Sequence, residues 1–168
     1  MKARILVWLV ALFCCHNVLF AQKEFVNASA RLSGHPRILL QKGEEKALKK
    51  VIMKDAVWKD IHLSLVDEAG EIVKLPLNER IKTGRRLLSV SRENLRRIFI
   101  LSYAYRMTGK NEFLKRAESE MLKAASFSDW NPSHFLDVGE MTMALAIGYD
   151  WLYPQLSVQT KEAIEKAI

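Results

Sequence analysis

The sequence predicts an all-α fold, and three observations indicate it. Every periodic stretch from Gln41 onward repeats its apolar residues at spacings of three and four, which is the period of an amphipathic helix. No stretch alternates apolar and polar residues as a half-buried strand does, and no Gly-rich hairpin signal is present. Single Gly, Pro, Asn and Ser residues stand between the helical stretches, where helices begin and end.

The first helical stretch covers 44–73, and we expect a break in it around Asp55. Pro76 and the polar residues after it then interrupt the helical pattern. The second helix is expected to start near Ser91. It should stop at Gly109, because glycine tolerates the left-handed conformation that often ends a helix.

The remaining helices have side chains suited to capping at their starts. Asn111 can cap the third helix, and Ser157 can cap a fifth that begins shortly before the end of the chain. Asn131 followed by Pro132 predicts the start of the fourth helix, with Asn131 as the cap and Pro132 in the first turn.

The helices are of two kinds, outer and inner. The third helix has an apolar stripe and a charged remainder, which predicts an outer helix with one side in solvent. Its stripe is Phe113, Ala117, Met121 and Ala125, and its charged residues are Glu112, Lys115, Arg116, Glu118, Glu120 and Lys123. The second and fourth helices contain uncharged runs at 99–105 and 141–149, so we expect them to lie inside. This alternation predicts antiparallel αα-hairpins that form the first part of an incomplete (α/α) toroid.

The first 21 residues have the layout of a secretory signal peptide. Lys2 and Arg4 precede an apolar run, and Ala21 stands at the expected cleavage point. An uncleaved membrane anchor is the alternative. The mature chain would then be 22–168, in the periplasm or secreted, with no membrane span left after cleavage. Both cysteines, Cys14 and Cys15, lie in the leader, so no disulfide or thiolate metal site is expected in the mature chain.

The charge balance favours an anionic partner. Removing Lys2 and Arg4 with the leader leaves 24 of the 26 basic residues against 19 acidic ones, a net charge of +5. A net positive charge attracts anions over long range. Nucleic acid is excluded by export, whereas a solvated basic surface without a partner stays open. We expect no cofactor.

The loops before the inner helices gather at one end of such an array, because inner helices all run the same way. These loops are 83–91 and 127–134. They bring to one rim Arg85, Arg86, Trp130, Asn131 and His134. Helix N-termini there favour anions, since their backbone N–H groups are unpaired and the helix dipole is positive at that end. A basic, aromatic and amide-bearing rim suits an acidic polysaccharide.

Four segments resemble the N-terminal region of the heparinase II/III-like polysaccharide lyases. They are "HPRILL" (35–40), "GRRLLSVSRENLRRI" (84–98), "YRMTGKNEFLKRAESEM" (105–121) and "DWNPSHFLDVGEMTMALAIGYDWLY" (129–153). The resemblance runs from about Gly34 to the end of the chain. Its most specific part is the block "DWNPSHFLDVGEM".

This resemblance implies an N-terminal α/α toroid, followed in the family by β-sandwich domains, and cleavage of uronic-acid glycans such as heparin or heparan sulfate by β-elimination. The family's catalytic Tyr and His lie farther along the toroid than this chain reaches. We therefore assign no catalytic residue here, expect that set beyond Ile168, and expect no lyase activity from this chain alone. The matching block implies a substrate-binding role for Asn131 and His134, with Trp130 and Arg85 as neighbours.

Each of these residues also has a plainer interpretation. Asn131 is a good helix cap without any ligand, and Trp130 can plug a helix end. His134 lies three residues before Asp137 and can simply be held by it. A metal site made of His134, Asp137 and Glu140 fits helical spacing but has no further clustered ligand to support it.

Two other functions stay open besides a lyase. A glycoside hydrolase on a similar toroid needs two opposed carboxylates, and the rim loops offer only Asp129. A non-catalytic helical-repeat module that binds glycans needs no catalytic set at all.

Overall fold

The computed structural model describes residues 34–168, so the predicted signal peptide at 1–21 lies outside the described residues. Within 34–168 the chain forms six α-helices and no β-strand. The prediction of an all-α fold is confirmed for this part of the chain.

The first two helices, α2 (Glu45–Lys54) and α3 (Ala56–Lys74), are separated at Asp55. Asp55 is extended, and its carboxylate accepts hydrogen bonds from the backbone N–H groups of Val57 and Trp58 at 2.9 and 3.2 Å. These bonds satisfy two of the donors that a helix start leaves free. The expected break is therefore confirmed, and a side-chain cap accounts for it.

Helix α4 spans Leu88–Thr108 and α5 spans Asn111–Ala125. Gly109 joins them at φ 73°, and its N–H donates to the carbonyl of Tyr105 at 2.7 Å, as expected for a glycine that ends a helix. Two predicted starts are wrong. Helix α4 begins three residues before Ser91, because the carbonyl of the buried Leu87 already accepts from the N–H groups at 90 and 91. Asn111 is the first helical residue, and Lys110 precedes it as the cap.

Helix α6 spans Phe135–Leu152 and α7 spans Val158–Ala167. The expected start of α6 is also wrong: His134 is the N-cap residue, and Asn131 and Pro132 lie in a turn before it. Asn131 has φ 59°, a left-handed conformation that asparagine adopts more readily than most residues, so the chain reverses there before the helix begins. Ser157 caps α7 as expected, since its hydroxyl accepts from the Thr160 N–H at 3.0 Å.

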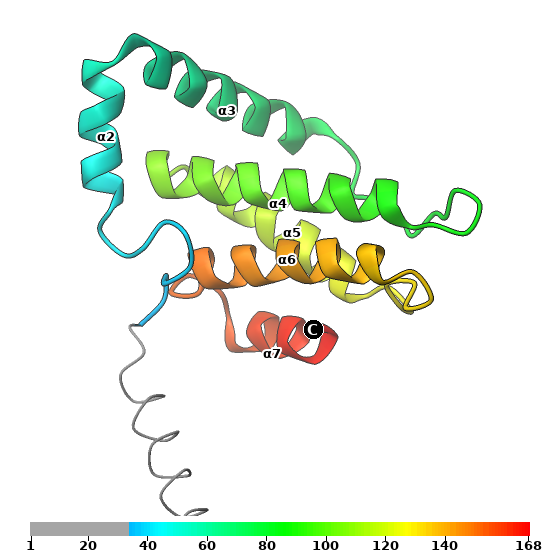
Figure 1. Ribbon diagram of the computed structural model, residues 1–168. Helices are drawn as coiled ribbons and strands as arrows, with labels where there is room; N and C mark the ends of the chain where they lie inside the picture. Colours follow the sequence, from blue (N-terminus) through cyan, green and yellow to red (C-terminus); the bar gives the residue numbers. More distant parts are fainter. Residues whose placement is uncertain (1–33) are drawn as a thin grey trace, which may run out of the picture. The chain divides into compact units, whose positions relative to one another are not determined.

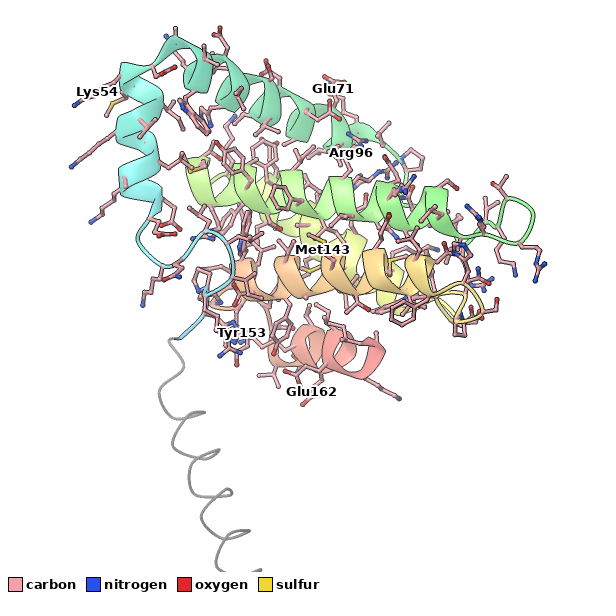
Figure 2. The ribbon with its side chains drawn as sticks, in the orientation of Figure 1. Lys54, Glu71, Arg96, Met143, Tyr153 and Glu162 are labelled. Atoms are coloured by element: carbon pink, nitrogen blue, oxygen red, sulfur yellow. The ribbon has the colours of Figure 1, made fainter. Side chains whose placement is uncertain are left out.

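Helices α4 and α6 lie side by side, and α5 packs behind both (Figure 1). The two helices run the same way, because Leu87 contacts Asp137 at their N-terminal ends while the rings of Phe99 and Trp151 lie 5.1 Å apart near the other end. Helix α3 packs on α4, and α7 packs on α5 and α6. Arg96 of α4 points toward α3 (Figure 2), where it pairs with Glu68.

The tightest approach between helices is at Gly148 of α6. A Cβ atom added there would lie 2.5 Å from Cγ2 of Ile98 on α4 and 2.5 Å from Sδ of Met121 on α5. All three residues belong to the fully covered interior. The absence of a side chain at 148 is what lets α6 rest on its two neighbours.

Helix α5 departs from the predicted pattern most clearly at Glu120. Phe113, Ala117 and Met121 are buried as expected, but Glu120, which was expected in solvent, is only 1% exposed. Its carboxylate pairs with Arg116 at 2.7 Å and with Arg97 of α4 at 3.1 Å. A buried carboxylate persists only when paired, and here a neighbouring helix supplies one of the partners.

The segment 35–38 is fastened to the C-terminal end of α6. The buried carboxylate of Asp150 accepts from the backbone N–H groups of Arg37 and Ile38 at 2.9 and 2.8 Å and contacts His35 Nδ1 at 2.5 Å. The Trp151 indole N–H donates to the carbonyl of Ile38 at 2.7 Å. We call residues 35–38 the strap.

Candidate anion-binding site

The loops before α4 and α6 are in contact at the N-terminal ends of these helices. Arg80 donates to the carboxylate of Asp129 at 2.6 Å and to its backbone carbonyl at 2.9 Å. The amide of Asn131 donates to the backbone carbonyl of Arg85 at 2.9 Å. Three contacts therefore hold together the two segments in which the predicted site residues lie.

Asp137, in the first turn of α6, is the centre of this junction. Its side chain is fully buried. One oxygen, Oδ2, accepts from the Leu87 N–H at 2.7 Å and from the Asn131 amide at 2.6 Å. The other, Oδ1, lies 2.9 Å from Nδ1 of His134. One carboxylate thus connects the start of α4, the loop before α6 and the histidine at the start of α6.

The hydrogen bonds keep Asp137 ionised. Burial by itself raises the pKa of this carboxyl group, but bonds from Asn131, the Leu87 N–H and His134 outweigh burial, so the pKa lies below its usual value. Since an ionised carboxylate can only accept, Nδ1 of His134 must carry the hydrogen.

A pocket of about 220 Å³ opens at this junction and is lined by Arg85, Arg86, Ser133 and His134. Both arginines are exposed, and within residues 34–168 neither guanidinium takes part in an ion pair. The guanidinium group carries a permanent charge and donates in a fork that fits carboxylate or sulfate. The pocket can therefore bind an anionic group and offers a hydroxyl and an imidazole beside it.

The four predicted site residues are not all in this pocket. Arg85 and His134 line it together. Asn131 lies beneath it, only 3% exposed, and its amide is fully used: Nδ2 donates to Arg85 and Asp137, and Oδ1 is 3.4 Å from Lys82 Nζ. In this structure Asn131 positions the loop. Contact between Asn131 and substrate stays a prediction.

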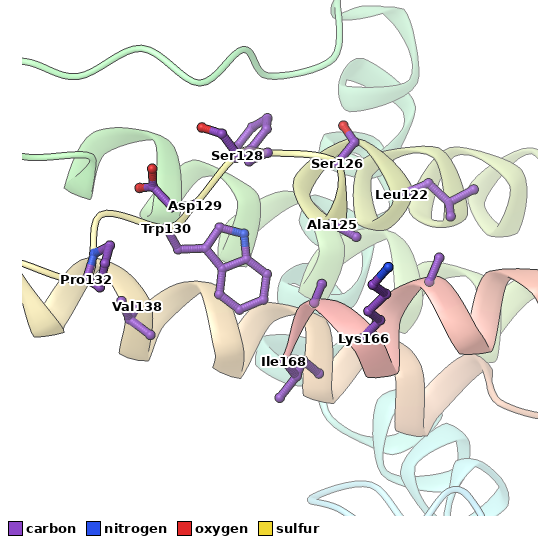
Figure 3. Close-up of a pocket in the computed structure, with 13 residues that line it drawn as sticks. Leu122, Ala125, Ser126, Ser128, Asp129, Trp130, Pro132, Val138, Lys166 and Ile168 are labelled. Carbon is purple, nitrogen blue, oxygen red and sulfur yellow. The ribbon is translucent and has the colours of Figure 1, made fainter.

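Trp130 borders a different and larger pocket (Figure 3). This pocket, of about 750 Å³, is lined by 13 residues from the C-terminal part of α5, the loop after it, α6 and α7. The Trp130 indole donates to the carbonyl of Ala124 at 3.0 Å, so the ring closes the end of α5. Trp130 is only 8% exposed: its ring covers the end of α5, and one edge of the ring borders the larger pocket. The strongly exposed aromatic residue near His134 is Phe135, at 83%.

The described residues contain no group of three or more His, Cys, Asp and Glu side chains arranged to hold a metal. Glu140, the third member of the metal set considered from the sequence, pairs with Arg92 of α4 at 3.1 Å. None of the helices within 34–168 combines the length and apolar character needed to cross a bilayer.

The carboxylates of the rim are poor general acids. A hydrogen bond from Arg80 lowers the pKa of Asp129, and the hydrogen bonds described above lower the pKa of Asp137. A glycoside hydrolase needs one carboxyl group that stays protonated near neutral pH. These two groups do not supply it.

Sequence reasoning missed Asp137 as the organising residue of the site. It was considered as a partner of His134 and as a member of a metal set with His134 and Glu140, because its bonds to Leu87 and Asn131 depend on how α4 and α6 pack. A signal was present: an acidic residue in the first turn of a largely apolar helix is a candidate partner for backbone N–H groups. Compared with models of known protein families and with curated proteins, the chain gives no match.

Proposed function

We propose that this chain is the N-terminal part of an exported polysaccharide lyase, and that an acidic glycan binds in the pocket of Arg85, Arg86, Ser133 and His134. The observation that carries the proposal is the pair of exposed guanidinium groups beside an oriented imidazole. A lyase must neutralise the uronate carboxylate before the C5 proton can leave. Two unpaired arginines suit that requirement.

The architecture supports the same proposal. We infer that α3 to α7 are the first helices of an (α/α) toroid, with α4 and α6 as its inner helices. In support, α4 and α6 run the same way and lie side by side, α3 packs on α4, α5 packs on both, and α7 packs on α5 and α6. Leu122 and Ile168, at 37% and 56% exposure, border the larger pocket, where further helices of a toroid would pack.

The second candidate is a glycan-binding module without catalysis. A lyase needs a base to remove the C5 proton and an acid to protonate the leaving oxygen. We assign neither role to a residue of 34–168, and a binding module needs neither. Because this chain alone is expected to have no lyase activity, the two candidates are separated by incubating uronic-acid glycans with the full-length protein that contains it. A lyase leaves an unsaturated sugar that absorbs in the ultraviolet, and a binding module leaves none.

Binding is tested by charge reversal with a matched control. The double variant Arg85→Glu and Arg86→Glu should weaken binding to heparin and to polygalacturonate at least about tenfold, as expected when charged hydrogen bonds are lost. The control is Lys49→Glu with Lys50→Glu, an adjacent and exposed basic pair on α2 that makes the same change in net charge. Neutral dextran tests whether charge is needed.

The expected result is loss of binding in the arginine double variant only. Equal weakening by both double variants would show attraction by net charge without a site, and it would overturn the proposal. Measurements near physiological ionic strength, where exposed charges are screened beyond about 8 Å, reduce the contribution of net charge.

A further inference from the structure

His134 contributes to the pocket through one ring nitrogen only. Its Nδ1 lies 2.9 Å from Oδ1 of the buried Asp137, on the side of the ring that faces the helix. Its Nε2 makes no hydrogen bond with any residue of 34–168 that the structure describes. Because the imidazole side chain is 27% exposed and lines the pocket, Nε2 is the nitrogen that a ligand can reach.

The tautomer of His134 follows from the partner. A carboxylate has no hydrogen to give, so Nδ1 must be the donor, and in the neutral imidazole Nε2 is then left with its lone pair. The pocket accordingly presents two arginines that only donate, the Ser133 hydroxyl, which donates to Oδ1 of Asn131 at 3.3 Å, and one histidine nitrogen that accepts. Inorganic sulfate can satisfy the arginines, but it has no hydrogen to offer the histidine.

We infer that Asp137 is a positioning residue that makes Nε2 of His134 a hydrogen-bond acceptor, and that the pocket recognises a sugar carboxylate together with a neighbouring hydroxyl. This inference rests on the proposed function and narrows it to uronic acid units that keep a free hydroxyl. The arginines bind the carboxylate, and His134 accepts from the hydroxyl.

The two oxygens of the Asp137 carboxylate have different partners, so one substitution can change the contact with His134 and keep the others. Leu87 N–H and the Asn131 amide both donate to Oδ2, whereas His134 contacts Oδ1. In Asp137→Asn, an amide with its oxygen at the Oδ2 position keeps both loop contacts. Its NH₂ group then stands at the Oδ1 position and donates to Nδ1 of His134. The substitution therefore inverts the histidine tautomer, and Nε2 becomes a donor.

The experiment uses the chain at about pH 8.5, above the usual range of imidazole protonation. Long-range ¹H–¹⁵N NMR of the ring nitrogens identifies the tautomer, and calorimetry measures binding of tetragalacturonate, heparin and inorganic sulfate. We expect an Nδ1–H tautomer in the wild type and an Nε2–H tautomer in Asp137→Asn. Tetragalacturonate should bind the variant more weakly, by up to about tenfold, because the sugar hydroxyl must turn its hydrogen away from the ring to accept from Nε2. Inorganic sulfate should bind the variant no more weakly than the wild type, because a donating Nε2 suits an anion that only accepts.

His134→Phe provides a second route should Asp137→Asn unfold. It removes Nε2 and leaves Asp137 with its contacts to Leu87 and Asn131, and it should give the same selective loss of tetragalacturonate binding. A role for His134 in folding alone would not distinguish the sugar from sulfate.

Three results would overturn the inference: an Nε2–H tautomer in the wild type, undiminished tetragalacturonate binding both in Asp137→Asn with the tautomer inverted and in His134→Phe, or wild-type binding of heparin but not of tetragalacturonate. In the third case the pocket still binds an anionic glycan, and only the restriction to uronic acid units with a free hydroxyl is wrong. If the wild type binds neither tetragalacturonate nor heparin, the proposed function is wrong, and the glycan part of the inference is wrong with it.

Discussion

Replacing Gly148 by alanine puts a methyl group where α6 meets α4 and α5. The new carbon would lie 2.5 Å from Cγ2 of Ile98 and 2.5 Å from Sδ of Met121. Carbon atoms in contact prefer about 3.5–4.0 Å. Met121 has flexible torsions and can move aside, but Ile98 is branched at Cβ and has little freedom within a helix. The helices must therefore separate slightly at this point.

The magnitude follows from two opposed effects. Overpacking of a filled interior costs about 1–3 kcal/mol, and the close contact with the stiff Ile98 argues for the upper half of that range. Alanine returns about 1 kcal/mol, because it is a better helix former than glycine. We expect Gly148→Ala to lower the free energy of unfolding by about 1–2 kcal/mol.

Gly139 provides a control in the same helix. It is exposed, and a Cβ atom there would meet nothing within 4 Å, so Gly139→Ala should stabilise the chain by about 0.5–1 kcal/mol. Thermal unfolding followed by circular dichroism compares the two variants. At about 4 °C per kcal/mol for a chain of this size, the Tm should fall by about 4–8 °C for Gly148→Ala and rise by about 2–4 °C for Gly139→Ala. If Gly148→Ala also raised the Tm, α6 would not pack as tightly on α4 as described.

Three further expectations concern single side chains. Glu120→Ala should destabilise the chain by about 3 kcal/mol in urea unfolding, since it leaves the buried Arg97 with one carboxylate fewer, whereas a loss under 1 kcal/mol would show that Glu120 is not buried. Asp55→Ala should cost about 1 kcal/mol through loss of the α3 cap, and Asp55→Asn should restore most of it. The Asp137 carboxylate has a lowered pKa in the fold, so its contribution to stability is full above about pH 4 and is lost as the pH falls through the folded-state pKa. On acidification the Tm of the wild type should therefore fall more steeply than that of Asp137→Asn, and parallel curves would contradict this.

The fold class could be predicted because helical periodicity is a local property. The break at Asp55, the end at Gly109 and the cap at Ser157 each depend on one side chain and its own backbone. Where the prediction failed, a distant residue decided. Asn131 has the chemistry of a cap, yet its amide bonds to Arg85 and Asp137, and the helix starts four residues later. Propensity does not reveal such competition.

The location of the candidate site could be predicted from the sequence, but the residues that line it could be predicted only in part. That the loops before α4 and α6 meet follows from two neighbouring helices that run the same way, and Arg85 and His134 do share a pocket. The sequence could not indicate that Trp130 turns toward α5. Its indole N–H donates to a backbone carbonyl, and because every residue has one, no side chain in the sequence marks the partner. The burial of Glu120 was hidden for a related reason: its partner Arg97 comes from another helix.

The strap joins the start of the described chain and the C-terminal end of α6 into one cooperative unit. Asp150 lies 115 positions after His35, so the strap cannot dock until α6 has been synthesised and packed. Once docked it cannot fray as a terminal segment usually does, because its release would leave the buried carboxylate of Asp150 without its donors. In native-state hydrogen exchange, the amides of Arg37 and Ile38 would then exchange in the same opening event as the C-terminal turns of α6, while those of α2, their nearer neighbours in sequence, exchange earlier. The strap is thus synthesised before every helix of the described chain but docks among the last, and once docked it is among the last segments to open.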